Sequence, residues 1–124
     1  MHFKNKKILV VGLGLSGQAA VRFFLQQGAS VEATDREKCS LPRTLLKHSR
    51  WVGVHWGEHS PHLFLDKDLI LVSPGVPLDL PGIRLARRRK IPVLGEFGLA
   101  AEILKEKLKI PMIAVTGTME NRQP

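Results

Sequence analysis

Hydrophobic and polar residues alternate along the chain with two different periods. Residues 7–11 form a continuous aliphatic run, which is typical of a strand buried on both faces of a parallel sheet. In residues 16–27 the apolar positions recur every three or four residues and Gly28 follows as a stop, so an amphipathic helix is predicted there. A second strand is predicted at residues 30–34. Strand, glycine turn, helix and strand in this order predict a parallel βαβ unit with a right-handed crossover.

The same alternation continues through the rest of the chain. It predicts a short helix at residues 43–48, strands at 51–55 and 68–72, a basic helix at 81–89 and a strand at 91–94. Together these elements predict an α/β fold, a Rossmann-like doubly wound parallel sheet. A helical pattern at 96–108 and a short aliphatic strand at 111–115 look like the opening of a second domain. We therefore expect one Rossmann-like domain at residues 1–94 and, at 95–124, a short tail that begins a second domain whose remainder is missing.

Length and composition limit the class of protein. A chain of 124 residues buries one core, and its 44% hydrophobic and 24% charged residues are ordinary for a globular domain. Cys39 is the only cysteine, so no intrachain disulfide can form and a cytoplasmic location is expected. No apolar stretch approaches the roughly 20 residues that a membrane helix needs, so no membrane partner is expected.

The formal net charge is +8, and much of it is concentrated in two basic stretches. One is the segment 84–90, and the other contains Lys105, Lys107 and Lys109. Such clusters can bind nucleic acid or an anionic membrane, or they can form the solvated face of a helix. The chain has no helix-turn-helix, zinc or aromatic-platform motif beside them. This favours the solvated face, so no nucleic-acid partner is expected.

Three glycines carry the strongest local signal. Gly12, Gly14 and Gly17 form a G-x-G-x-x-G set between the first predicted strand and the first predicted helix. The first permits a tight turn, the second lets a phosphate approach the backbone, and the third permits close packing of helix and strand. The backbone N–H groups near Leu15 and Ser16 have no partner within the helix and lie at the positive end of its dipole. This arrangement predicts a diphosphate site, although a turn that serves only packing has the same spacing.

Two further segments end at the same predicted edge of the sheet. Asp35 ends the second strand, roughly 20 residues after the glycines, where a carboxylate can accept hydrogen bonds from a ribose or a base. Ser73 and Gly75 belong to the tetrapeptide SPGV, which directly follows the strand predicted at 68–72. Because ligands of open α/β sheets bind outside the carboxyl ends of the strands, both segments join the glycine turn in one predicted nucleotide site. An ordinary Pro-Gly turn is the alternative for SPGV.

Four histidines, His48, His55, His59 and His62, lie close together in the chain. A metal site would need acidic or thiolate ligands beside them and an element that presents all of the ligands together. The sequence shows neither, so we interpret them as surface and loop histidines and expect no metal site.

The end of the chain resembles the start of a P-loop. Thr116, Gly117 and Thr118 follow the strand predicted at 111–115, where a P-loop would continue into Gly-Lys-Ser/Thr. Residues 119–124 read Met-Glu-Asn-Arg-Gln-Pro instead. The strand predicted at 111–115 would lack its sheet, so we expect residues 111–124 either to swing free or to self-associate by pairing with another molecule.

Five motifs in a fixed order carry a resemblance to a known family. They are VGLGLSG at 11–17, TDR at 34–36, SPGV at 73–76, IPVLGE at 91–96 and IAVTGT at 113–118. Over residues 6–118 the chain resembles the Mur ligases, in particular those that add D-glutamate to UDP-N-acetylmuramoyl-L-alanine in peptidoglycan synthesis. The resemblance implies an N-terminal domain that binds the UDP part of this substrate, followed by a central domain that binds ATP and magnesium. It also implies that TGT continues into Asn-Gly-Lys-Ser-Thr-Thr. Deletion of one base from codons for these residues produces the reading at 119–124, so we expect a frameshift within an intact P-loop.

The resemblance also implies roles for individual residues. The backbone at Leu15 and Ser16 would face the UDP phosphates, and Asp35, Arg36 and Gly75 would lie near the uridine. In the family, ATP phosphorylates the alanyl carboxylate, which the amine of D-glutamate then attacks. Every group that stabilises the transferred phosphoryl would come from regions absent from this chain. We therefore expect the chain to bind the UDP-sugar, to have no cofactor of its own and to lack activity.

Two other functions compete with that of a ligase fragment. A dinucleotide-binding oxidoreductase or a ligand-sensing Rossmann module would share the first βαβ unit, but the SPGV and TGT motifs favour the ligase. A basic nucleic-acid-binding protein would use residues 84–90 and would bind arbitrary duplex DNA with strong salt dependence.

Overall fold

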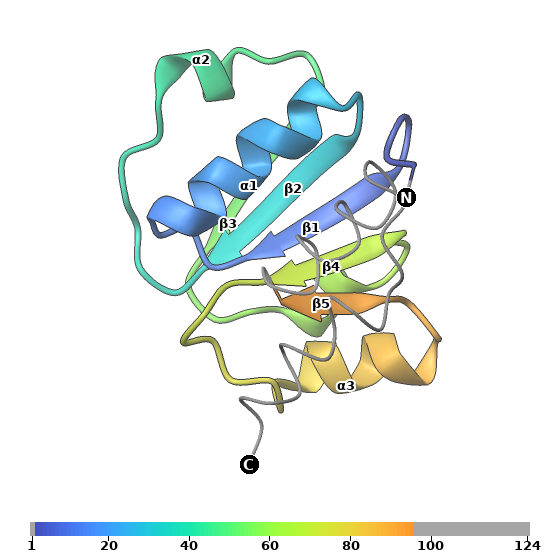
Figure 1. Ribbon diagram of the computed structural model, residues 1–124. Coiled ribbons are helices and arrows are strands. Elements are labelled where there is room, and N and C mark those ends of the chain that lie inside the picture. The colour runs from blue at the N-terminus through green and yellow to red at the C-terminus, as the bar shows by residue number, and fades with distance from the viewer. Residues whose placement is uncertain (1, 96–124) are drawn as a thin grey trace, which may run out of the picture.

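The computed structural model describes residues 2–95, which form a five-stranded parallel sheet flanked by helices (Figure 1). The strands are β1 (Lys7–Val11), β2 (Ser30–Asp35), β3 (Trp51–Trp56), β4 (Leu69–Val72) and β5 (Val93–Gly95). The helices are α1 (Leu15–Gln26), α2 (Arg43–Leu46), the 3-10 helix η1 (Pro61–Phe64) and α3 (Pro81–Arg88). The predicted α/β class and the Rossmann-like, doubly wound parallel sheet are therefore confirmed.

The side chains of the central strand alternate between two cores, one on each face of the sheet. Ile8 and Val10 of β1 belong to a cluster that includes Phe24 of α1, which lies on the near side of the sheet in Figure 1. Leu9 and Val11 point the other way and belong to a second cluster, which contains residues of η1 and α3. These four side chains are fully buried, which explains why residues 8–11 are an unbroken aliphatic run, whereas Lys7 at the start of β1 is exposed.

The strand order β3-β2-β1-β4-β5 determines where a ligand can bind. The chain starts at the centre, moves outward to β2 and β3, and then crosses to the other side of β1 to form β4 and β5. All neighbouring strands are parallel, so their carboxyl ends lie at one edge of the sheet. The order reverses between β1 and β4, and the crevice outside such a reversal is the usual ligand site of open α/β sheets.

Some elements differ from the sequence-based predictions. The 3-10 helix η1 is not predicted by periodicity, yet its Phe64 is fully buried and packs on Gly82 of α3, where a Cβ atom would overlap the phenyl ring. The helix predicted at residues 43–48 is a single turn that ends at Leu46. The elements predicted within residues 96–124 lie outside the described residues.

Helices α1 and α3 end in the same hydrogen-bonded motif. After α1, the N–H of Ala29 donates back into the last helical turn at 3.1 Å, and Gly28, the predicted stop, has a positive φ of 86°. After α3, the N–H of Ile91 donates to the carbonyl of Ala86 at 2.9 Å, and the equivalent left-handed residue is Lys90, with φ of 62°. Because the backbone is still closing α3 here, β5 starts later than the strand predicted at 91–94.

The basic stretch at residues 84–90 lies on α3 and in the turn that follows it. Its charged residues are all exposed: Arg84, Arg87, Arg88, Arg89 and Lys90. Their exposure matches the solvated helix face predicted from the sequence. Within residues 2–95, no helix combines the length and the apolar character that crossing a membrane would take.

Replacing Lys90 with glycine is expected to stabilise the protein. A side chain in the left-handed region costs about 1 kcal/mol, and the glycine variant is relieved of this cost. Part of that gain in stability is offset because glycine loses more backbone entropy on folding. A net gain of about 0.5 kcal/mol raises Tm by roughly 2–4 °C for a domain of this size, which calorimetry would detect. Lys90→Ala keeps the strained backbone and is the control. An equal rise in Lys90→Ala would show that the backbone conformation is not the cause.

Candidate functional site

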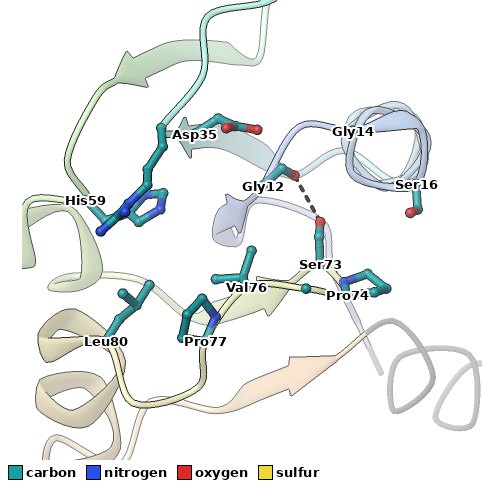
Figure 2. A pocket seen from close by; sticks show the side chains of 12 residues that line it. Gly12, Gly14, Ser16, Asp35, His59, Ser73, Pro74, Val76, Pro77 and Leu80 are labelled. Atoms are coloured by element: carbon teal, nitrogen blue, oxygen red, sulfur yellow. Dashed lines mark hydrogen bonds between the residues drawn. The ribbon is translucent and has the colours of Figure 1, made fainter.

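A pocket of about 490 Å³ lies outside the carboxyl ends of β1, β2 and β4, at the point where the strand order reverses. Seven of the residues predicted from the sequence line it: Gly12, Gly14, Ser16, Asp35, Arg36, Ser73 and Gly75. Figure 2 shows the glycine turn, the end of β2 and the segment after β4 converging on this space. The predicted convergence of these three segments is therefore confirmed.

The glycine turn is packed too closely for side chains at two of its three glycines. Gly12 has φ of 98°, and a Cβ atom there would lie 2.9 Å from the Cβ of Ser73. The Ser73 hydroxyl donates a hydrogen bond of 2.9 Å to the Gly12 carbonyl (Figure 2). A Cβ on Gly17 would overlap that same carbonyl, so Gly17 serves helix–strand packing and does not line the pocket. A Cβ on Gly14 would meet open space, because this residue faces the pocket.

The N-terminus of α1 points its free backbone donors toward the pocket. Gly14 is the N-cap residue, without a side-chain cap, and the first turn contains no acidic residue. The first N–H groups of a helix have no partner within it, and the helix dipole adds partial positive charge there. Leu15 contributes only backbone, since its side chain is 89% exposed and does not line the pocket. This end of the pocket is therefore suited to an anion such as a phosphate.

Asp35 organises the glycine turn as well as lining the pocket. Its Oδ2 accepts a hydrogen bond of 2.6 Å from the N–H of Leu13, and its Oδ1 accepts one of 2.9 Å from the N–H of Glu37. Each carboxylate oxygen has two lone pairs, so both can still accept a hydrogen bond from a ligand. The sequence predicted a ligand contact for Asp35. The structure adds that this carboxylate fixes the loop between β1 and α1.

His59 lies in the loop after β3, as expected from the sequence, and it also lines the pocket, which the sequence did not predict. Its Nδ1 lies 2.9 Å from Oγ1 of Thr34, the residue before Asp35. Burial lowers the pKa of His59, and the nearby positive charge of Arg36 lowers it further. One signal could have identified His59: it follows the carboxyl end of β3 by three residues, at the same edge of the sheet as the glycine turn.

The remaining wall of the pocket is largely apolar. Val76, Pro77 and Leu80 come from the segment between β4 and α3 and lie across the pocket from Asp35 (Figure 2). The pocket therefore has an anion-binding end at α1, polar groups along β2, and an apolar wall. This combination fits an elongated ligand that has phosphate at one end and a flat, polar-edged ring at the other.

Two further expectations concern a metal site and the ATP-binding remnant. Among residues 2–95, no three His, Cys, Asp or Glu side chains are grouped so that they could hold a metal ion. The ATP-binding remnant predicted at Thr116, Gly117 and Thr118 lies outside the described residues, as does the predicted frameshift.

Curated relatives match nearly the whole chain. The UDP-N-acetylmuramoylalanine–D-glutamate ligase of Geobacter sp. (strain M21) is 45% identical over 120 residues, which are 95% of this chain and 26% of that protein. The ligase of the same name from Koribacter versatilis (strain Ellin345) is 40% identical with the same coverage. The chain thus spans about a quarter of the length of the curated relatives that it matches.

Solved structures share the fold. UDP-N-acetylmuramate-alanine ligase MurC from Thermotoga maritima is 25% identical with a TM-score of 0.65, over 82% of this chain and 23% of that one. A pseudomurein peptide ligase type C from Methanothermus fervidus is 27% identical with a TM-score of 0.61, over 86% and 21% of the two chains. D-lactate dehydrogenase from Escherichia coli, 18% identical over 77% and 29% with a TM-score of 0.55, shows a similar fold alone.

The family model described as "Mur ligase MurD-like, N-terminal domain" matches residues 6–95. This range contains the whole sheet from β1 to β5 and every residue that lines the pocket. The match covers more than half of the chain and agrees with relatives that are 40% and 45% identical. The chain therefore belongs to the Mur ligase family and contains its MurD-like N-terminal domain.

Proposed function

We propose that this chain is the UDP-sugar-binding part of an ATP-dependent ligase that adds D-glutamate to UDP-N-acetylmuramoyl-L-alanine in peptidoglycan synthesis. The names of the curated relatives support this reaction. The observation that carries the proposal is the pocket itself, where a helix N-terminus, a strand-end carboxylate and an apolar wall meet at the reversal of strand order. On this proposal the enzyme works in the cytoplasm.

The polar groups of the pocket fit the two ends of UDP. The diphosphate lies at the N-terminus of α1, where the N–H groups of Leu15 and Ser16 donate to it. The uridine extends toward Asp35, Arg36 and Gly75, which also line the pocket. The exposed guanidinium of Arg36 adds a positive charge on that side.

The domain positions the substrate and leaves the chemistry to other parts of the enzyme. On this proposal residues 1–94 bind UDP-N-acetylmuramoyl-L-alanine, and residues 95–124 belong to the start of the ATP-binding central domain, with Thr116 to Thr118 at the ATP phosphates. ATP and magnesium bind there and supply the phosphoryl group that activates the alanyl carboxylate. The 124-residue chain alone is expected to bind substrate without ligating it.

A dinucleotide-binding oxidoreductase is the rival function, because dehydrogenases share the sheet and the glycine turn. The likeness to D-lactate dehydrogenase is 18% in sequence and supports a common fold only. Membership of the Mur ligase family favours the UDP-sugar.

Titration calorimetry with UDP, NAD and ATP tests the proposed ligand. The chain is expected to bind UDP in preference to the other two, whereas preference for NAD would contradict the ligase assignment.

Gly14→Ala is expected to weaken UDP binding at least about tenfold, because the new methyl group occupies the space where a phosphate approaches the backbone. The fold tolerates this change, since the Cβ would meet open space. Unchanged UDP binding in a folded Gly14→Ala variant would show that the diphosphate does not bind at the N-terminus of α1.

Asp35→Ala is expected to weaken UDP binding by roughly tenfold or more, because the N–H of Leu13 loses the acceptor that fixes the turn. Asp68→Ala is a matched control: Asp68 accepts a hydrogen bond of 2.8 Å from the N–H of Lys7, at the opposite edge of the sheet. Asp35→Ala removes two carboxylate–amide hydrogen bonds and Asp68→Ala removes one, but only Asp35 lines the pocket. Calorimetry should show unchanged UDP affinity for Asp68→Ala. Equal effects of the two substitutions would show that Asp35 acts through general stability alone.

A further inference from the structure

The ring of His59 is held against the sheet by a buried hydroxyl group. Thr34 is fully buried, and its Oγ1 lies 2.9 Å from Nδ1 of His59. The ring lines the pocket at the end away from Ser16, on the same side as Leu80 (Figure 2). The second ring nitrogen, Nε2, has no partner within residues 2–95 and remains available to a ligand.

The contact with Thr34 determines which nitrogen of the ring carries the proton. Burial and then the charge of Arg36 lower the pKa of His59, so the ring is neutral at neutral pH and has one N–H. The Thr34 hydroxyl makes no other hydrogen bond in the described part of the chain. If Nδ1 donated to Thr34, the buried hydroxyl proton would have no acceptor, which is costly. The hydroxyl therefore donates to Nδ1, and the ring proton lies on Nε2.

The arrangement of residues around the pocket determines the orientation of a bound nucleotide. Its anion-binding end is at Gly14 and Ser16, and Asp35 lies between that end and His59 (Figure 2). A nucleoside diphosphate with its phosphates at α1 and its ribose near Asp35 places the base beside His59, with Leu80 on the apolar wall. Position 4 of a pyrimidine is on the edge away from the ribose, so the substituent at that position faces the imidazole.

We propose that His59 is a specificity-determining residue that selects uracil, because its Nε2–H donates a hydrogen bond to the 4-carbonyl oxygen of the base. Cytosine carries an amino group at this position, so two donors would face each other and neither would have an acceptor. The inference rests on the proposed UDP-binding function and names the group that distinguishes UDP from CDP.

Titration calorimetry with UDP and CDP tests the proposal, because the two ligands carry the same ribose and diphosphate. The wild-type chain is expected to bind UDP at least about tenfold more tightly than CDP. His59→Asn places an amide near the position of Nδ1, where it can pair with Thr34 but does not reach the base. This variant is expected to bind UDP about fivefold to tenfold more weakly and to have similar Kd values for UDP and CDP.

His59→Gln is the matched control. Its amide nitrogen extends to about the position of Nε2, so the donor to the base is kept while the contact with Thr34 is lost. This variant is expected to retain the preference for UDP. Since both variants lack the imidazole, the comparison separates the contact with the base from the loss of the ring, and thermal unfolding verifies that both are folded.

The outcomes distinguish this inference from the proposed function. If the wild-type chain binds UDP but does not prefer it to CDP, or if His59→Asn keeps the preference, the role of His59 is overturned while UDP binding stands. If the wild-type chain does not bind UDP at all, both proposals fail. Should His59→Asn not fold, nitrogen NMR of the wild-type ring decides the question. A proton on Nδ1 of the neutral ring would overturn the inference, and a proton on Nε2 would support it.

Discussion

The backbone of Gly12 holds the pocket together, because it makes close contacts with three elements at once. Its N–H donates to the carbonyl of Thr34 at 2.8 Å, and its carbonyl accepts the Ser73 hydroxyl at 2.9 Å. The same carbonyl lies against Gly17 so closely that a side chain there would overlap it. The ends of β1, β2 and β4 and the start of α1 are thereby fixed relative to one another. A side chain on Gly12 would push apart the segments that form the site.

Thr34 extends this network from the glycine turn to the far end of the pocket. Its carbonyl is bound to Gly12, and its hydroxyl is bound to His59. The next residue, Asp35, uses both carboxylate oxygens to hold backbone N–H groups on either side of the end of β2. The polar lining is thus built from the last two residues of one strand, which are themselves anchored to the turn. A ligand finds these groups already in place, which reduces the ordering that binding requires.

The sequence predicts those features that depend on local pattern. The buried run of β1, the helix that Gly28 ends, and the convergence of three strand ends all follow from periodicity and from the geometry of parallel sheets. The burial of Phe64 could not be predicted in this way, because it depends on Gly82, far away in the chain. The same holds for His59, since its position depends on pairing between β2 and β3 and on a hydroxyl whose burial the sequence does not reveal.

The left-handed backbone of Lys90 escapes sequence analysis for a related reason. A glycine after a helix, such as Gly28, predicts the end of that helix from the sequence. A lysine gives no such signal, although Lys90 has the same left-handed backbone conformation as Gly28. In α3 the stop is imposed by tertiary structure: the next residue, Ile91, packs against the core shared by η1 and the sheet. Local strain at one exposed lysine is therefore offset by burial of its neighbour. The burial of Ile91 thus keeps the C-terminal end of α3 in place. At its other end, α3 begins directly after Leu80, the last residue of the apolar wall that faces Asp35.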